Sequence, residues 1–197
     1  HAETIRLYLL TLLEEASYAV GLDTPLPLEL DSAAQIAADL GTDAVLATLI
    51  RALELERPVP AQAAARVLGQ IGDADGLIYG GSDPTPLIQA VNNPDRRVRW
   101  AALEAIMSLG PESAYPGSSD VVEMLMHMIA STGDRNVVIA SNNNGEVNRL
   151  GGTLMPLGYE FLSAYEGRTA MEVATSSSDV ELILIDARIQ NPPIDVL

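Results

Sequence analysis

Asp186 is the acidic residue whose position best suits chemistry, because it closes an unbroken apolar run. Residues 181–186 read Glu-Leu-Ile-Leu-Ile-Asp, a pattern typical of a buried strand. Open α/β sheets bind ligands beyond the carboxyl ends of their strands, so a carboxylate at this point can contact a ligand. The alternative is an acid that ends the strand and caps the next loop, and the sequence leaves both interpretations open.

A polar loop follows the other strand-like run in the same half of the chain. The apolar residues 137–140 are followed by a serine, three asparagines and a glycine at 141–145. A glycine-containing loop that enters a helix can hold an anion on its backbone N–H groups. Asparagine also caps helices and occupies turns, which needs no ligand. The segment has no GxGxxG or GxxxxGK[ST] pattern, so we expect a cap rather than a nucleotide site.

The basic residues form one cluster, at Arg96, Arg97 and Arg99, and the only tryptophan, Trp100, follows it. These arginines could bind an acidic peptide, but exposed charges on a helix usually form solvated pairs, so we expect them to pair with neighbouring acids. Trp100 could anchor a partner protein or pack between helices. These four residues are therefore our candidates for a protein-binding surface.

Composition excludes several classes of catalytic chemistry. The chain has no Cys and no Lys, and all 11 of its Lys and Arg residues are Arg. Disulfides, thiolate nucleophiles, Cys-ligated zinc and lysine Schiff bases are therefore excluded. Imidazole could come only from His1 and His127, and His127 lies among Met124, Met126 and Met128, which cannot share one helix face. We therefore expect no catalytic residue and no metal site.

The charge of the chain is strongly negative, with 27 acidic residues against 11 basic ones and a net charge of −16. The acids are spread along the whole sequence, so we expect an acidic surface that repels phosphate backbones and anionic membranes. Neither nucleic acid nor membrane is expected as a partner. The sequence has no run of 18 apolar residues and no recognisable signal peptide, which favours a cytoplasmic location.

Two segments in the N-terminal half echo each other. Residues 98–110 read VRWAALEAIMSLG, and residues 60–72, which lie 38 positions earlier, read PAQAAARVLGQIG. Helical patterns at 43–56 and 85–92 precede them, and such a period is typical of stacked helical hairpins. The Val-Arg-x-Ala-Ala pattern of residues 98–102, followed by Leu109-Gly110, resembles the second helix of a HEAT-like repeat of the PBS-lyase type, with a partial match at 60–72. The resemblance implies an all-α platform for protein binding.

The pattern changes after residue 133, where a third repeat helix would be expected and a strand pattern appears instead. Strands are predicted at 136–140, 159–164 and 181–186, with helices at 144–157 and 167–177 between them. This order predicts a short parallel sheet, and its first and third strands are apolar enough to be covered on both faces. The fold class is therefore mixed, with a helical-hairpin repeat domain at 1–112, a linker and connecting helix at 113–133, and an α/β unit at 134–197.

Residues 136–188 resemble the first half of a response-regulator receiver domain, which has a flavodoxin-like fold. The motif at 157–159, Leu-Gly-Tyr, matches the turn before the second strand, and the motif at 184–186, Leu-Ile-Asp, matches the strand that carries the phospho-acceptor. The resemblance implies that Asp186 is the acceptor, and that Ser141 and Asn142 replace the acidic pair that holds Mg²⁺. Neutral oxygens bind Mg²⁺ weakly, so we expect a degenerate acceptor without a cofactor.

These observations favour a non-enzymatic scaffold or adaptor in signalling, with a pseudo-receiver module and a protein partner. The pseudo-receiver would dock or form a homodimer without being phosphorylated. One alternative is a phospho-switch in which Asp186 accepts a phosphoryl group, and a second is an accessory factor of an enzyme or a cofactor-attachment system. A sheet of three strands leaves an edge open, so we expect that edge to be covered by the helical part, by a second copy or by further chain.

Overall fold

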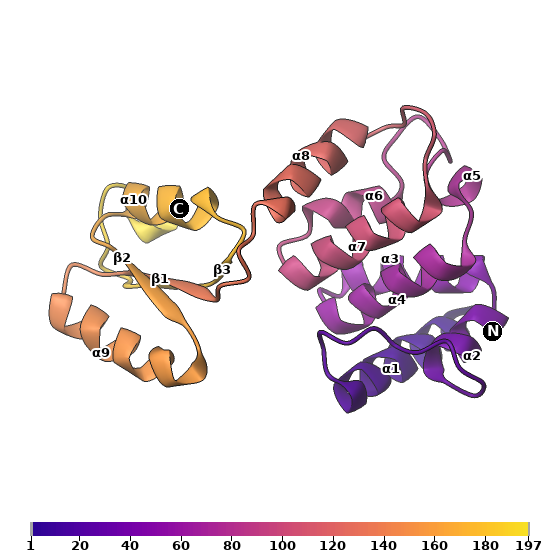
Figure 1. Cartoon of the computed structure of the whole chain (residues 1–197), viewed down its shortest axis with the longest axis horizontal. Coiled ribbons are helices and arrows are strands. Elements are labelled where there is room, and N and C mark those ends of the chain that lie inside the picture. The colour runs from indigo at the N-terminus through magenta and orange to yellow at the C-terminus, as the bar shows by residue number, and fades with distance from the viewer. Residues whose placement is uncertain (1, 197) are drawn as a thin grey trace. The chain divides into compact units, whose positions relative to one another are not determined.

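The computed structural model describes residues 2–196 (Figure 1). It is 60% helical and contains one three-stranded parallel sheet, which confirms the predicted mixed α/β layout at that level of detail. The chain forms two compact units, one ending at Leu125 and one starting at Met126, and the boundary lies inside α8 (Ser118–Ile129). Within residues 2–196, no helix is both long and apolar enough to span a membrane.

The first unit is a packed set of helices. They are α1 (Ala2–Val20), α2 (Ala33–Asp39), α3 (Thr42–Glu54), α4 (Pro58–Ile71), α5 (Ala74–Leu77), α6 (Pro86–Gln89) with a 3₁₀ turn at Ala90–Asn92, and α7 (Arg96–Leu109). α4 is the central helix, because it packs against α1, α3 and α7 (Figure 1). Alanine, valine and leucine are buried along most of its length, which is how one helix can serve three neighbours.

α4 and α7 pack closely because a glycine lies where they meet. A Cβ atom placed on Gly69 would lie 2.5 Å from the Cα atom of Ala105. Small residues on both helices therefore bring the two backbones together. These are the two helices of the repeated segments 60–72 and 98–110, and they lie side by side.

Local sequence signals account for both ends of α7. The Asp95 carboxylate accepts hydrogen bonds from the N–H groups of Arg97 and Val98 at 2.8 and 3.4 Å, and Gly110 ends α7 with a φ of 59°. α4 begins at Pro58, two residues before the repeated segment 60–72, because a proline fits the first turn of a helix, where a missing N–H costs nothing. The segment between α4 and α6 contains the short helix α5.

The second unit is a three-layer α/β/α structure. Its strands are β1 (Asn136–Ala140), β2 (Glu160–Ala164) and β3 (Val180–Ile185), all parallel in the order β2-β1-β3. α9 (Asn144–Leu154) covers one face of the sheet and α10 (Gly167–Ser176) covers the other (Figure 1). Short 3₁₀ turns lie at Met155–Leu157 and Ile194–Val196.

The predicted burial of the strands is correct for β1 and wrong for β3. Residues 137–140 of β1 are fully buried, because this strand lies in the centre of the sheet. β3 lies at an edge, where it has one neighbouring strand, and Ile183 is 41% exposed. An apolar run therefore identified the strand but did not show whether it is central.

Candidate functional site

Asp186 lies directly after β3, at the carboxyl edge of the sheet. Its backbone N–H donates to the carbonyl of Ala140 at 2.8 Å, and its own carbonyl accepts from the N–H of Ile189 at 2.9 Å. The sheet and the following turn therefore hold the backbone of Asp186 on both sides. This is the position predicted for a ligand-contacting carboxylate.

Arg188 occupies both oxygens of the Asp186 carboxylate. The Arg188 Nε atom donates to Oδ1 at 3.1 Å and Nη2 donates to Oδ2 at 2.9 Å, while the backbone N–H of Arg188 also donates to Oδ1 at 2.9 Å. Together with a hydrogen bond from Ser141, these contacts hold the pKa of Asp186 well below its usual range, and the guanidinium of Arg188 makes the largest contribution. Nothing in the sequence pattern pointed to this role of Arg188.

Ser141 and Asp186 are brought together as the receiver resemblance implies. The Ser141 Oγ atom donates to Asp186 Oδ2 at 3.1 Å, and the serine is buried. Its hydroxyl also accepts from the N–H of Asn143 at 3.2 Å. Asn142, the other residue matched to the acidic pair, is exposed to solvent. The buried side chain beside Asp186 is therefore a neutral hydroxyl.

The asparagine loop caps α9, which was the expected alternative to an anion site. The Asn143 Oδ1 atom accepts hydrogen bonds from the N–H groups of Gly145 and Glu146 at 3.0 and 3.3 Å. Two N–H groups that an anion would use are therefore engaged by the protein itself.

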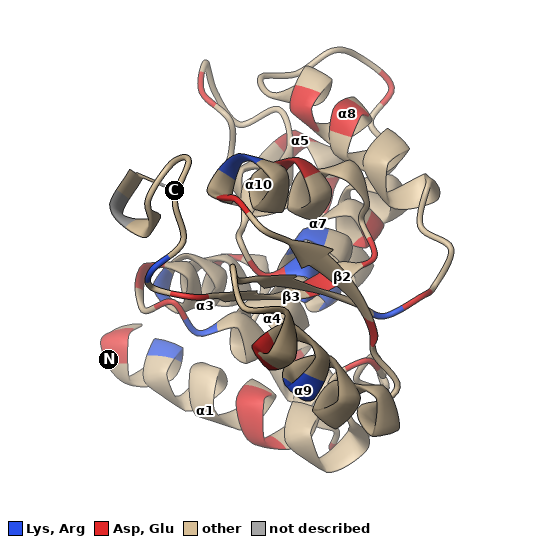
Figure 2. Cartoon of the chain, turned by 90° about the vertical axis from the view of Figure 1, so that its left-hand side faces the viewer, with Lys and Arg blue, Asp and Glu red and all other residues tan. Residues whose placement is uncertain are grey.

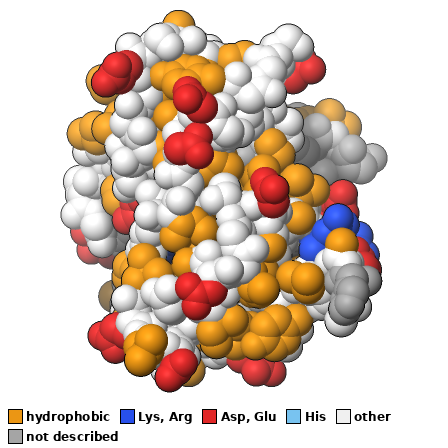
Figure 3. All heavy atoms as spheres, turned by 90° about the vertical axis from the view of Figure 1, so that its right-hand side faces the viewer, with side chains coloured by type: hydrophobic (Ala, Val, Ile, Leu, Met, Phe, Trp, Pro, Cys, Tyr) orange, Lys and Arg blue, Asp and Glu red, His pale blue; other side chains and the backbone are white. Residues whose placement is uncertain are grey.

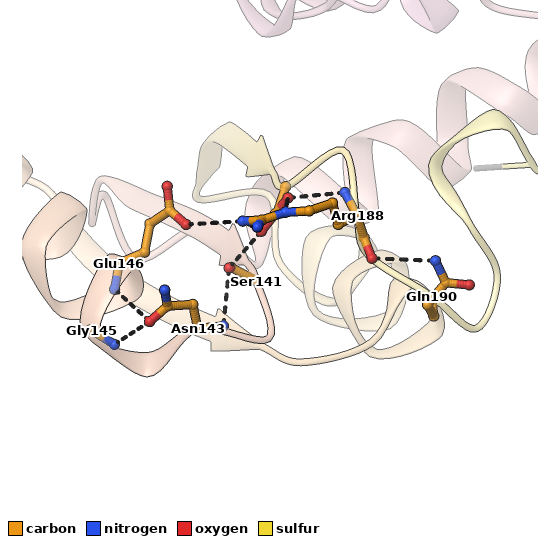
Figure 4. A network of polar contacts seen from close by, with 7 residues as sticks. Ser141, Asn143, Gly145, Glu146, Arg188 and Gln190 are labelled. Atoms are coloured by element: carbon orange, nitrogen blue, oxygen red, sulfur yellow. Dashed lines mark hydrogen bonds and ion pairs between the residues drawn. The ribbon is translucent and has the colours of Figure 1, made fainter.

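Glu146 joins this network from the first turn of α9. Its Oε2 atom lies 3.8 Å from Nη2 of Arg188, so the guanidinium that binds Asp186 also lies near the Glu146 carboxylate (Figure 4). The sequence carried one signal for Glu146, since an acid in the first turn of a helix is stabilised by the helix dipole. Nothing in the sequence pattern linked it to Arg188.

Asp179, at the opposite end of β3, is a buried acid that sequence reasoning missed. Its carboxylate accepts hydrogen bonds from the hydroxyl of Ser131 and from the N–H and the hydroxyl of Thr132, the last two at 2.9 Å. The Ser131 hydroxyl and the Thr132 N–H are the main causes that lower its pKa to about 2. Asp179 therefore ties the segment before β1 to the start of β3 and is a structural residue.

The arginines at the start of α7 divide into different roles. Arg99 donates from Nη1 to the carbonyls of Asn93 and Pro94 at 2.8 and 2.9 Å, so it holds the turn that precedes the helix. Arg97 is exposed, and its Nε atom lies 3.8 Å from a carboxylate oxygen of Asp23. Arg96 is half-buried. Of the three candidates, Arg97 is the exposed one.

Trp100 lies on the surface of α7 in a fixed orientation. Its ring nitrogen donates to Oε1 of Glu104 at 2.7 Å, and the other oxygen of Glu104 accepts from Nε of Arg66 on α4 at 3.0 Å. The indole remains 43% exposed, while the Arg66 side chain is only 13% exposed. Arg66 and Glu104 are 38 residues apart and occupy equivalent positions in the two repeated segments. A pair of opposite charges at equivalent repeat positions is the sequence signal that would have found this contact.

The surface charge follows the composition. Acidic residues occur on most elements visible in Figure 2, and in Figure 3 acidic side chains are scattered over the face shown while basic ones lie at one edge. Among residues 2–196, no group of three or more His, Asp or Glu side chains is arranged to hold a metal ion.

Comparison with known proteins identifies no relative. No family model, no curated protein and no solved structure matches the chain.

Proposed function

We propose that the protein is a non-enzymatic scaffold with two parts. The helical unit binds a protein partner, and the α/β unit is a receiver-like module that does not accept a phosphoryl group. The observation that carries this proposal is the engagement of both carboxylate oxygens of Asp186 by Arg188.

Phosphoryl transfer to an aspartate requires a free carboxylate oxygen that can attack in line and a cation that neutralises the incoming charge. The bidentate guanidinium occupies the oxygens, and Ser141 contributes a hydroxyl where a second carboxylate would help to bind the cation. The charge of Asp186 is therefore balanced from within the protein. This favours a pseudo-receiver that docks by its surface, including docking to a second copy, over a module that switches by phosphorylation.

Two further observations support the proposal. The strand order β2-β1-β3 is the order with which flavodoxin-like sheets begin. The repeated segments form α4 and α7, which pack side by side as the second helices of stacked hairpins would. A scaffold of this kind would act in the cytoplasm, with a partner that is neither nucleic acid nor membrane.

The phospho-switch is the less supported alternative, because Asp186 would first have to leave Arg188. No contact in the site favours the other alternative, an accessory factor of an enzyme or cofactor-attachment system.

Incubation of the full chain with acetyl phosphate and Mg²⁺ tests the proposal, with intact mass as the readout. We expect no added phosphoryl group on the wild type or on Asp186→Asn. A phosphorylated wild type together with an unmodified Asp186→Asn variant would show that Asp186 is an acceptor and would overturn the pseudo-receiver assignment.

A further inference from the structure

The geometry points to one docking surface, the exposed side of α7, and to the chemistry of its partner. This surface, the Trp100 face, consists of Arg97, Trp100, Glu104 and Met107. We infer that it binds an apolar segment of another protein that carries an Asp or Glu next to its apolar residues. The inference rests on the proposed scaffold function and names the class of partner.

The four residues lie on one side of one helix. Their spacing of three, four and three positions places them along a single stripe of α7. The opposite side of this helix is buried in the first unit and consists of aliphatic residues. The stripe is therefore presented by a helix whose position is already fixed by packing.

Trp100 is preorganised for binding. Its indole is held by Glu104, and Glu104 is held in turn by the largely buried Arg66. A side chain that is already ordered loses less conformational entropy when it binds a partner. Tryptophan is also one of the residues that most often dominate binding energy at protein interfaces. Met107 is 58% exposed and extends the apolar part of the stripe by two turns.

Charge complementarity selects a partner with a carboxylate. Arg97 presents a guanidinium whose recorded acidic neighbour, Asp23, lies 3.8 Å away and is itself almost fully exposed, so a closer carboxylate can replace it. The negative charge of Glu104 is balanced by Arg66 and does not repel an acid at this place. On the rest of the surface, the net charge of −16 repels an acidic segment. The position of Arg97 therefore decides where along α7 the carboxylate of the partner binds.

The test is selection of random twelve-residue peptides displayed on phage against the immobilised full chain, followed by binding measurements in solution. We expect the enriched peptides to combine large apolar residues with at least one Asp or Glu. Because Trp100 is the only tryptophan, binding of a tryptophan-free peptide should shift its emission to shorter wavelength. Labelled peptides should bind Trp100→Ala at least tenfold more weakly by fluorescence polarisation.

Two matched controls show whether binding depends on the Trp100 face or on any exposed arginine or methionine. Arg97→Glu should weaken binding at least fivefold, whereas Arg149→Glu, the same change at an exposed arginine of α9, should not. Met107→Ala should weaken binding, whereas Met155→Ala, at a methionine that is 61% exposed elsewhere, should not.

The inference is overturned if no peptide is enriched above the bare support, if enriched peptides bind Trp100→Ala as well as the wild type, or if Arg97→Glu behaves like Arg149→Glu. These outcomes are independent of Asp186. Peptide binding at Trp100 together with phosphorylation of Asp186 would overturn the pseudo-receiver assignment and leave the Trp100 face intact.

Discussion

The Arg188 guanidinium and the Asp186 carboxylate form a two-point contact at the end of β3, with Nη2 2.9 Å from Oδ2 and Nε 3.1 Å from Oδ1. A planar guanidinium matches a carboxylate in this geometry better than an ammonium group does. The two residues are separated by one position in the sequence, so the turn itself brings them together. This contact is the basis of the pseudo-receiver assignment.

Replacement of Arg188 should raise the pKa of Asp186. The guanidinium favours the charged carboxylate, so Arg188→Ala should move the pKa up toward the ordinary value of about 4. Arg188→Lys retains the charge but loses the two-point geometry, and should give a smaller rise. The measurement is an NMR titration of the Asp186 side-chain carboxyl carbon, with Arg149→Ala as the control that should leave the pKa unchanged. Equal pKa values in Arg188→Ala and the wild type would show that the contact does not exist in solution.

Asp179→Asn should destabilise the second unit by about 2 kcal/mol at neutral pH, because the amide cannot accept all the hydrogen bonds that the carboxylate accepts. The pKa of Asp179 is lowered to about 2 in the folded protein. The stability it adds is therefore complete above the unfolded pKa of about 4 and is lost as the pH falls toward 2. Amide hydrogen exchange of β1 in urea gives the free energy of unfolding of each protein. The difference between the wild type and Asp179→Asn should be constant from pH 7 to about 5 and smaller at pH 3. A difference in the free energy of unfolding that does not change with pH would show that the negative charge of Asp179 does not stabilise the unit.

Gly69→Ala should destabilise the helical unit, because the new Cβ atom would overlap Ala105 where α4 meets α7. Overpacking at such a contact costs about 1–3 kcal/mol. Urea unfolding followed by the fluorescence of Trp100 reports on this unit. A variant as stable as the wild type would mean that α4 and α7 are farther apart in solution than in the structure.

Two adjacent glycines of α9 provide an internal comparison for the second unit. A Cβ atom on Gly151 would lie 2.5 Å from the ring of Phe161 on β2, whereas a Cβ atom on Gly152 has no neighbour within 4 Å. Gly151→Ala should therefore destabilise the unit, and Gly152→Ala should stabilise it by up to about 1 kcal/mol through helix propensity. Hydrogen exchange of the β1 amides measures the stability of both variants. If Gly151→Ala were the more stable of the two, the packing of α9 on the sheet would be contradicted.

Glu104→Ala should release the indole of Trp100 and destabilise the helical unit. Glu104 links Trp100 to Arg66, and its removal leaves the largely buried guanidinium of Arg66 without this partner, which costs about 1–3 kcal/mol. Time-resolved fluorescence anisotropy should show faster local motion of the indole than in the wild type. Glu15→Ala, at an exposed acid of α1, is the control and should leave the motion unchanged. Equal motion in Glu104→Ala and the wild type would show that the indole is held by packing alone.

The parts of the fold that depend on local chemistry were predictable from the sequence. α7 begins after an aspartate that accepts hydrogen bonds from its first N–H groups and ends at a glycine with positive φ, and both signals lie within one turn of the helix end. The three strands and the two helices between them follow from hydrophobic periodicity in the same way. The position of β3 at an edge did not follow, because an apolar run indicates a strand but not its place in the sheet.

The candidate site was predictable only in part. Asp186 and Ser141 each follow a predicted strand, and the carboxyl ends of parallel strands meet at one edge of a sheet. Their contact was therefore predictable from the sequence. The role of Arg188 did not follow, because a long side chain can reach several neighbours and only the turn geometry selects one. The contact of Glu104 with Arg66 and the role of Asp179 were missed because the partners are distant in sequence, although the 38-residue spacing of Arg66 and Glu104 equals the repeat period.

The most direct test of the central claim is the response of the full chain to beryllofluoride with Mg²⁺, followed by NMR of the backbone amides. Beryllofluoride mimics a phosphoryl group on an aspartate that is free to accept one. We predict that the amides of Ser141, Asp186 and Arg188 do not shift at millimolar ligand. Shifts at these amides in the wild type that are absent in Asp186→Asn would show that Asp186 is available to a phosphoryl group, and would contradict the pseudo-receiver proposal.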